Sequence, residues 1–272
     1  MTTPAAANPS PLTPAATSVR GRFLWYDLMV PDVDAAVRFY SAVTGWTTTP
    51  FATGDDTPPY TMWTNGDAPL GGVMALPGGV TAPPHWMTHV GTPDVDATHR
   101  DALALGANSV VPPTDIPTVG RFAILADPKG ATFAIFQPSN PAVPATAAMP
   151  AVGEFSWHEL ATSEPESVFD FYARLFAWEK TDAMPMGAAG VYQMFGQRGT
   201  TYGAVFPRAA AESPPHWLLY VRVADLGRAL DAVRAGGGRV TREPTPVPGG
   251  EIAHCVDPQG APFALHEAAD AA

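Results

Sequence analysis

Cysteine is almost absent from this chain of 272 residues, and Cys255 is its one example. No disulfide can form within the chain, which argues against a disulfide-stabilised secreted domain and favours a reducing cytoplasm. Long apolar runs are also missing, since none approaches the roughly 18 residues of a membrane-spanning helix. Residues 1–20 lack the basic start and apolar segment of a signal peptide. We therefore predict a cytoplasmic protein with no membrane partner.

Basic residues are scarce as well. The chain has 15 Lys and Arg against 26 Asp and Glu, for a net charge of −11, and its basic residues form no cluster. Nucleic acids and anionic membrane surfaces are bound by concentrated positive charge, so we expect neither as a partner. The acidity itself is explained by solubility.

Several catalytic motifs are missing from the sequence. It has no glycine loop for phosphate, no Gly-x-Ser-x-Gly elbow and no CxxC or HxH spacing for a metal. What it does have is a hydrophobic content of 46%, with seven Trp and thirteen Phe, which is enough for a substantial core.

A strand followed directly by a helix is the dominant pattern. Residues 23–29 alternate as a strand does, and Asp32 begins a stretch with apolar residues at helical spacing that Gly45 ends. Three shorter strand candidates follow, at residues 46–51, 60–64 and 71–76. The order strand, helix and three strands is then complete.

The same order begins again after a further strand at residues 85–90. The sequence Pro-Asp-Val-Asp-Ala occurs at residues 31–35 and at 93–97, an offset of 62 residues. Its helix is expected to end at Gly106. Strands are predicted at residues 109–111, 121–125 and 132–136, the last two joined by the turn Asp-Pro-Lys-Gly.

The second half of the chain repeats the first. Trp25, Tyr40 and Trp46 have counterparts 132 residues later, and the Asp-Pro turn at Asp127 recurs at Asp257, 130 residues later. We therefore divide the chain into a disordered tail (1–20), a first domain (21–137), a Pro/Ala linker (138–152) and a second domain (153–268).

These repeated motifs resemble those of the vicinal oxygen chelate superfamily, which includes glyoxalase I, extradiol dioxygenases and the fosfomycin and bleomycin resistance proteins. The resemblance rests on the strand-to-helix stretch ending in Phe-Tyr and on the late Asp-Pro-x-Gly-x-x-Phe turn. It implies an α+β fold of two tandem glyoxalase-like domains. Each domain would be a pair of βαβββ units whose mixed sheets curl around a cavity.

The resemblance also implies where a divalent metal would be held, because family enzymes use His, Glu or Gln on the first and last strands of each unit. The corresponding positions are Trp25, Met87, Ala134 and residues 72–76 in the first domain, and Trp157, Leu218, Ala264 and residues 203–206 in the second. None offers a metal ligand. We predict no metal and no cofactor at this place, although a register shift of two residues would bring in His89 or His266, so a divalent metal is not excluded.

Other polar residues share the cavity-facing side of the strands. Strand periodicity places Asp27 beside Trp25 and Glu159 beside Trp157, and the offsets make His89 and Tyr220 their counterparts in the partner units. The pairs Asp27/His89 and Glu159/Tyr220 are either acid–base groups or a hydrogen-bonded interior network. Trp25 and Trp157 either fill the cavities or form a stacking wall for a flat ligand. Tyr60, Tyr192, Met62 and Met194 are predicted to be core residues.

The leading functional hypothesis is a metal-independent small-molecule-binding protein with aromatic-lined cavities. The predicted ligand-binding residues are Trp25, Asp27, His89, Trp157 and Glu159. The alternative is an enzyme of the superfamily, either a metal-dependent lyase, isomerase or oxygenase or one that uses Asp27 and His89 for acid–base chemistry. The partner is a small molecule, the protein is a two-domain monomer or a homodimer, and the sequence leaves open whether any reaction is catalysed.

Overall fold

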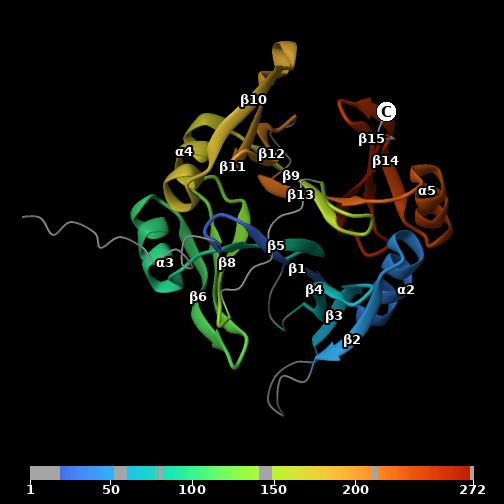
Figure 1. Ribbon diagram of the computed structural model, residues 1–272, viewed down its shortest axis with the longest axis horizontal. Coiled ribbons are helices and arrows are strands. Elements are labelled where there is room, and N and C mark those ends of the chain that lie inside the picture. Colours follow the sequence, from blue (N-terminus) through green and yellow to red (C-terminus); the bar gives the residue numbers. More distant parts are fainter. Residues whose placement is uncertain are drawn as a thin grey trace, which may run out of the picture.

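A computed structural model describes residues 19–51, 60–76, 78, 82–140, 149–209 and 214–269. Two mixed eight-stranded sheets make up the molecule, one from each half of the chain (Figure 1). Each sheet is built from two βαβββ units, which confirms the predicted α+β fold of paired units. No helix in the described ranges is long and apolar enough to cross a membrane.

The elements follow one another in the repeated order that the sequence predicts. The first domain contains β1 (Phe23–Val30), α2 (Val33–Thr44), β2 (Thr47–Phe51), β3 (Tyr60–Asn65), β4 (Ala68–Ala75), β5 (His85–Gly91), α3 (Val95–Ala104), β6 (Asn108–Ile116), β7 (Gly120–Ala126) and β8 (Thr132–Pro138). The second contains β9 (Phe155–Thr162), α4 (Pro165–Phe176), β10 (Glu179–Pro185), the short η1 (Gly187–Ala189), β11 (Val191–Gln197), β12 (Thr200–Pro207), β13 (His216–Arg222), α5 (Leu226–Ala235), β14 (Arg239–Val247), β15 (Gly250–Val256) and β16 (Pro262–Ala268).

Helix α2 begins and ends as its sequence predicts. The Asp32 carboxylate accepts the backbone N–H of Ala35 at 2.9 Å, so it satisfies a donor that the first helical turn leaves open. Gly45 ends the helix with φ of 78°, a left-handed conformation that glycine adopts without strain.

Strand β6 is longer than the predicted 109–111. It continues to Ile116 through Pro112 and Pro113. Proline cannot donate a ladder hydrogen bond, but β6 lies at the edge of its sheet, where one side of a strand needs no partner.

The central strands of each sheet come from different units. The orders are β2-β3-β4-β1-β5-β8-β7-β6 and β10-β11-β12-β9-β13-β16-β15-β14. β1 pairs with β4 in parallel and with β5 in antiparallel register, and β9 does the same with β12 and β13. The two units of a domain are therefore joined through their first strands.

The main core lies between the two domains. One hydrophobic cluster combines residues of β1 and α2 with residues of β13, α5 and β16, such as Leu28, Phe39, Leu219 and Phe263. A second cluster combines the remaining two units in the same way. Helix α2 accordingly lies beside α5, and α3 beside α4, at opposite sides of the molecule (Figure 1).

At this interface the Phe-Tyr motif of each domain contacts the Asp-Pro turn of the other domain. The hydroxyl of Tyr40 donates to the carboxylate of Asp257 at 3.3 Å, and the hydroxyl of Tyr172 donates to Asp127 at 3.2 Å. The indole N–H of Trp86 donates to the Tyr40 hydroxyl at 3.0 Å. Each Asp also accepts backbone N–H groups of its own turn, so the Asp-Pro turn of one domain holds the Phe-Tyr helix of the other.

Two further tryptophans connect the domains. The indole N–H of Trp46 donates to the carbonyl of Gly153, and that of Trp178 donates to the carbonyl of Gly21, both at 2.7 Å. Val19 is 2% exposed, and the Arg20 guanidinium donates to the carbonyl of Leu175. The last two residues of the predicted tail are thus packed against the molecule, and residues 1–18 lie outside the described part.

A buried histidine completes the interface. The Nδ1 atom of His158 lies 2.9 Å from the carbonyl oxygen of Tyr202, so Nδ1 carries the proton. Nε2 is therefore the acceptor for the hydroxyl of Tyr26, 2.8 Å away. Burial lowers the pKa of His158 to about 4, and the imidazole is neutral in the folded protein.

We expect Tyr40→Phe and Tyr172→Phe each to lower the free energy of unfolding by about 1–3 kcal/mol, because each leaves a buried carboxylate oxygen and an indole N–H without a partner. Urea denaturation measures the effect. Tyr202→Phe is the control, because this tyrosine is partly exposed and its hydroxyl takes no part in the crosswise contacts. Equal losses in all three variants would contradict this account of the interface.

We also expect stability to fall as the pH is lowered from about 6.5 to about 4. In this window the unfolded chain protonates His158 and the folded protein does not, so each pH unit costs up to about 1.4 kcal/mol from this group. In His158→Phe, chemical denaturation at several pH values should show lower stability at pH 7 but a shallower decline. An unchanged slope would refute the assignment.

Candidate functional site

We call the inner face of each sheet the side opposite to the one that packs against the helices. In the first sheet this face carries the residues that the sequence singles out. Trp25 and Asp27 alternate on β1, and Met87 and His89 alternate on β5. In the antiparallel register Trp25 lies opposite His89, and Asp27 lies opposite Met87. Asp27 and His89 are therefore diagonal neighbours on one face, close enough for their side chains to meet.

Asp27 is the centre of a hydrogen-bonded cluster. Its Oδ2 atom lies 2.9 Å from Nε2 of His89. Its Oδ1 atom accepts the hydroxyl of Tyr60 at 2.6 Å and the indole N–H of Trp25 at 3.1 Å. The same indole N–H lies 2.6 Å from the Tyr60 hydroxyl. Three donors from three strands thus converge on one carboxylate.

Gly72 allows Tyr60 to reach this carboxylate. Gly72 lies opposite Asp27 on β4, and a Cβ atom added there would lie 2.1 Å from the Tyr60 ring. In the second domain the position carries Ala204, and the longer Glu159 replaces Asp27. Its Oε1 atom accepts the hydroxyl of Tyr192 at the same 2.6 Å.

The cluster holds Asp27 as a charged carboxylate. Burial alone raises the pKa of Asp27, but the charge and hydrogen bond of His89, with those of Tyr60 and Trp25, bring it below its usual value. Burial and the Asp27 charge raise the pKa of Tyr60, so its hydroxyl remains a donor. Because Nε2 of His89 donates to the carboxylate, Nδ1 is the ring atom left to exchange a proton, and it has no partner among the described residues.

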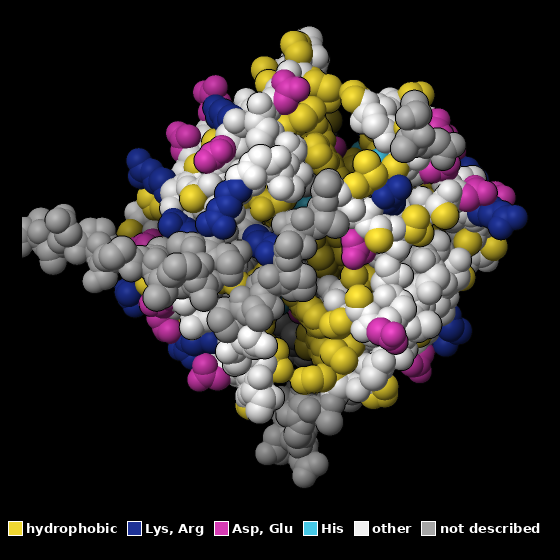
Figure 2. All heavy atoms as spheres, viewed as in Figure 1, with side chains coloured by type: hydrophobic (Ala, Val, Ile, Leu, Met, Phe, Trp, Pro, Cys, Tyr) yellow, Lys and Arg dark blue, Asp and Glu magenta, His cyan; other side chains and the backbone are white. Residues whose placement is uncertain are grey.

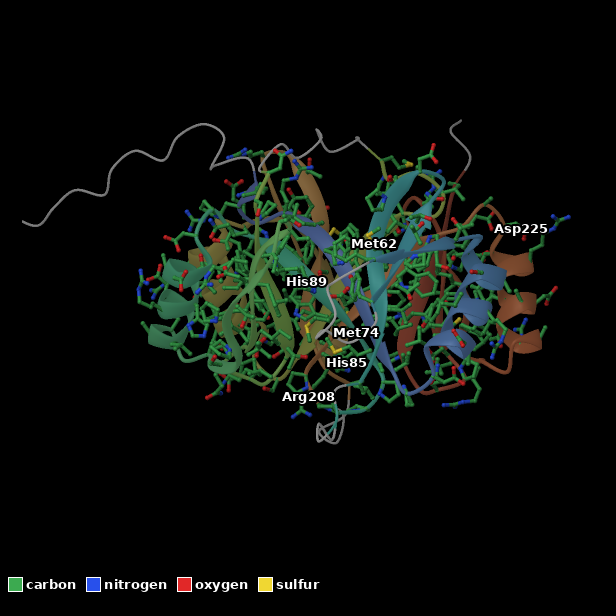
Figure 3. The ribbon with its side chains drawn as sticks, turned by 90° about the horizontal axis from the view of Figure 1, so that it is seen from below. Met62, Met74, His85, His89, Arg208 and Asp225 are labelled. Atoms are coloured by element: carbon green, nitrogen blue, oxygen red, sulfur yellow. The ribbon has the colours of Figure 1, made fainter. Side chains whose placement is uncertain are left out.

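Trp25 and Trp157 differ from the other tryptophans in exposure. Both are partly exposed, whereas the remaining tryptophans are buried in the core. Methionines lie on the same face of the sheet. Met29 pairs with Met74 on one side and with His85 on the other. Figure 3 shows Met62, Met74, His85 and His89 in the middle of the molecule. The inner face of the first domain is therefore apolar around one charged cluster.

The second domain has a related but longer network. The indole N–H of Trp157 donates to the Tyr192 hydroxyl at 2.7 Å, and that hydroxyl donates to Glu159. Tyr220 lies close enough to Glu159 for each group to shift the pKa of the other, and its hydroxyl lies 2.8 Å from Nε2 of His254. A tyrosine thus stands between the carboxyl group and the imidazole that are in direct contact in the first domain.

The protonation preferences of the two networks are opposite. Burial raises the pKa of Glu159 above its usual value despite hydrogen bonds from Tyr192 and Tyr220. Burial, with the nearby charges of Arg242 and His216, lowers the pKa of His254 to about 4. The second domain therefore shifts its carboxyl and its imidazole toward their neutral forms, while the first shifts its carboxyl toward the charged form.

The structure brings both predicted pairs together, Asp27 with His89 and Glu159 with Tyr220. Tyr60 and Tyr192 were predicted as core residues, and instead they donate to the two carboxyl groups. Their recurrence at the same offset of 132 was the available signal. His254 was missed, because its first-domain counterpart is Ile124 and no repeat marks it.

The positions that the family resemblance assigns to a metal do not fit one. Trp25 and Met87 supply no metal ligand, and Ala134 lies opposite His89 without a donor. Asp27 and His89 are two donors bonded to each other, whereas a protein metal site needs at least three. The described residues contain no group of three or more His, Cys, Asp or Glu side chains arranged to hold a metal ion.

Two hollows lie elsewhere, between α2 and α5. They measure about 250 and 540 Å³ and are lined largely by small side chains such as Ala42 and Ala232. Neither is lined by a carboxylate–imidazole pair.

Paired βαβββ units with a polar cluster on the inner face of a curled sheet define a glyoxalase-like class of protein. Residues 25–136 match the model of the glyoxalase-like domain, and residues 154–265 match that of the glyoxalase/bleomycin resistance protein/dioxygenase superfamily. The chain belongs to this superfamily, with two tandem domains.

Relatives of similar length exist. The chain is 30% identical over 251 residues to the putative glyoxylase CFP32 of Mycobacterium tuberculosis, covering 89% of this chain and 92% of the relative. It is 29% identical over 263 residues to the anthracycline biosynthesis protein DnrV of Streptomyces peucetius, with the same coverage.

Solved structures share the fold. The Mn(II)-bound glyoxalase from Novosphingobium aromaticivorans superposes with a TM-score of 0.60 at 15% identity, covering 91% of this chain and 82% of that one. The 2,3-dioxygenase LapB from Pseudomonas sp. KL28 gives 0.63 at 13% identity, covering 92% and 93%. At these identities the likeness concerns the fold alone.

Proposed function

We propose that this protein binds flat small molecules on the inner faces of its sheets, without the metal that the family's enzymes use. The proposal rests mainly on the position, the partial exposure and the fixed orientation of Trp25 and Trp157. They stand at first-strand positions where a metal ligand is expected from the family, they are partly exposed, and their indole N–H groups are fixed by hydrogen bonds.

A fixed indole suits a binding surface. An aromatic ring that is already held in place loses little conformational freedom when a ligand stacks on it. The methionines beside Trp25 add an adaptable apolar surface. Figure 2 shows hydrophobic side chains gathered around a hollow over the second domain, in the upper part of the view, and around another over the first domain, in the lower part.

The name of one relative supports a flat aromatic ligand. DnrV is named as an anthracycline biosynthesis protein, and anthracyclines contain a planar ring system. The same chemistry matches the apolar face that carries Trp25, which also includes Met74, opposite Met29, and Phe136, whose ring lies 6.3 Å from that of His89. We therefore propose a planar polycyclic aromatic compound as the ligand class.

Trp25→Ala should weaken the binding of a flat hydroxyanthraquinone such as emodin by about tenfold, because a stacking surface is removed. Isothermal titration calorimetry on protein treated with EDTA measures the affinity. Trp157→Ala, the matched change in the other domain, tells which inner face is used.

Two results would count against this function. One is an affinity that neither substitution changes, since neither indole would then contact the ligand. The other is binding that EDTA abolishes and Mn²⁺ or Ni²⁺ restores, since the ligand would then depend on a metal. Elemental analysis of protein purified without chelators checks the second point independently.

A second candidate function is acid–base catalysis by Asp27 and His89. The observation in its favour is the 2.9 Å contact between the Asp27 carboxylate and Nε2 of His89, which leaves Nδ1 as the basic atom. A carboxylate that orients and charges an imidazole is the arrangement of a general base. The reaction class would be proton abstraction next to a carbonyl group.

This candidate predicts that the protein accelerates hydrogen–deuterium exchange at the carbons next to the carbonyl of hydroxyacetone in D₂O, followed by proton NMR. His89→Gln keeps a donor for Asp27 but removes the base, so the rate should fall by about 10²–10⁴-fold. His85→Gln, on the same strand and face, is the control. Equal rates in the two variants would eliminate the proposal.

The remaining predictions concern the setting of the protein. We propose that it works in the cytoplasm as a two-domain monomer or a homodimer. In support, Cys255 is a buried thiol whose pKa burial raises to about 12, so it is poorly suited to form a disulfide.

A further inference from the structure

The inner faces of the two domains differ in charge at equivalent positions. In the first domain, β6 pairs Val111 with Ile124, and β5 pairs Gly91 with Phe136. The same places in the second domain pair Arg242 with His254 and Arg222 with His266. Apolar residues of one domain are thus replaced by potential cations in the other, within a chain whose net charge is −11.

These side chains lie close to the Glu159 network. His254 lies opposite Ala264, Ala264 lies opposite Tyr220, and His254 lies 2.8 Å from the Tyr220 hydroxyl. Arg242 lies opposite His254 on the next strand, so its side chain is on the same face. Arg242 is exposed, which places it toward the mouth of this face, with Tyr220 at the floor.

The effect of the Arg242 charge on nearby pKa values agrees with a position of Arg242 on the inner face. Its positive charge contributes to the pKa shifts of Glu159, Tyr192 and His254, which come from three different strands. Its one hydrogen bond in the described residues, from Nε to the Thr245 hydroxyl at 3.3 Å, leaves the remaining guanidinium donors available. No carboxylate forms an ion pair with it in the described residues.

The other two side chains, Arg222 and His266, already have hydrogen-bond partners. Arg222 donates to the carbonyl of Pro150 at 2.6 Å, and Nδ1 of His266 lies 3.1 Å from the Ser156 hydroxyl. Nδ1 of His254 has no partner among the described residues, and in the tautomer in which Nε2 accepts the Tyr220 hydroxyl it carries the proton and can donate to an anion. Arg242 and His254 are therefore the pair that can bind a new group.

We propose that the inner face of the second domain binds a small aromatic anion, with Arg242 and His254 on its acidic group and Trp157 against its ring. This rests on the proposed binding function and gives the second domain a ligand class of its own. Burial shifts Glu159 toward its neutral form, which lowers its repulsion of such a ligand. The first domain, with Ile124 and Val111 at these positions, takes an uncharged ring system.

Two fluorescent probes with one skeleton test the charge requirement. 8-Anilinonaphthalene-1-sulfonate carries a sulfonate, and N-phenyl-1-naphthylamine lacks it. In titrations of the full chain, Arg242→Met should raise the dissociation constant of the sulfonate about five- to tenfold, as expected for loss of a charge-assisted contact, and should leave the neutral probe unchanged. Arg228→Met, a matched loss of charge on the exposed side of α5, should change neither.

His254→Gln is the second variant and should weaken the sulfonate selectively as well. Circular dichroism melts confirm that each variant is folded. If Arg242→Met and Arg228→Met weaken the sulfonate equally, or if Arg242→Met has no effect, the anion site is overturned while binding of flat molecules stands. If the wild-type protein binds the neutral probe but not the sulfonate, the anion proposal also fails. Absence of binding by both probes counts against both proposals.

Discussion

The crosswise hydrogen bonds between Tyr40 and Asp257 and between Tyr172 and Asp127 are the constraint on which the rest of the structure depends. Each joins a helix of one domain to the Asp-Pro turn of the other, within a core that both domains share. Because the apolar residues of the sheets and helices are used between the domains, the inner faces are not needed to form the main core. They are therefore free to carry polar and partly exposed residues without loss of the fold.

This division explains what the sequence could predict. Residues at the shared core recur at fixed offsets because each performs the same task twice, so the repeat revealed the units and their order. The repeat could not show that Tyr40 contacts Asp257 of the second domain and not Asp127 of its own domain. An offset tells which residues are equivalent, but it does not tell which residues touch. Strand periodicity correctly put Asp27 and His89 on one face. Tyr60 was missed because its contact depends on the register of β3 and on Gly72, which only the structure provides.

The two inner faces differ in several residues but keep one contact, that between a tyrosine hydroxyl and a carboxyl group. A Trp, a Tyr and a carboxyl group remain in both domains, with the tyrosine hydroxyl 2.6 Å from the acid in each. The change from Gly72 to Ala204 is accompanied by the longer side chain of Glu159. Replacing His89 by Tyr220 then moves the imidazole one step outward, to His254. The core-facing residues tolerate fewer such exchanges, because a change of volume there creates a cavity or strain in a packed interior.

The hydrogen-bonded network around Trp25 joins the proposed binding surface to the Asp27–His89 pair. Oδ1 of Asp27 accepts from Trp25 and Tyr60, and Oδ2 is bonded to His89. The indole orientation and the tautomer of the imidazole are therefore set by the same carboxylate, which burial makes costly to leave unpaired. Under the proposed function, a ring stacked on Trp25 would lie beside His89, which is opposite Trp25 in the register, and a polar group on that ring could bond Nδ1. Position and polarity of such a ligand would then be selected together, by a cluster that includes Trp25 at a position that the family resemblance assigns to a metal ligand.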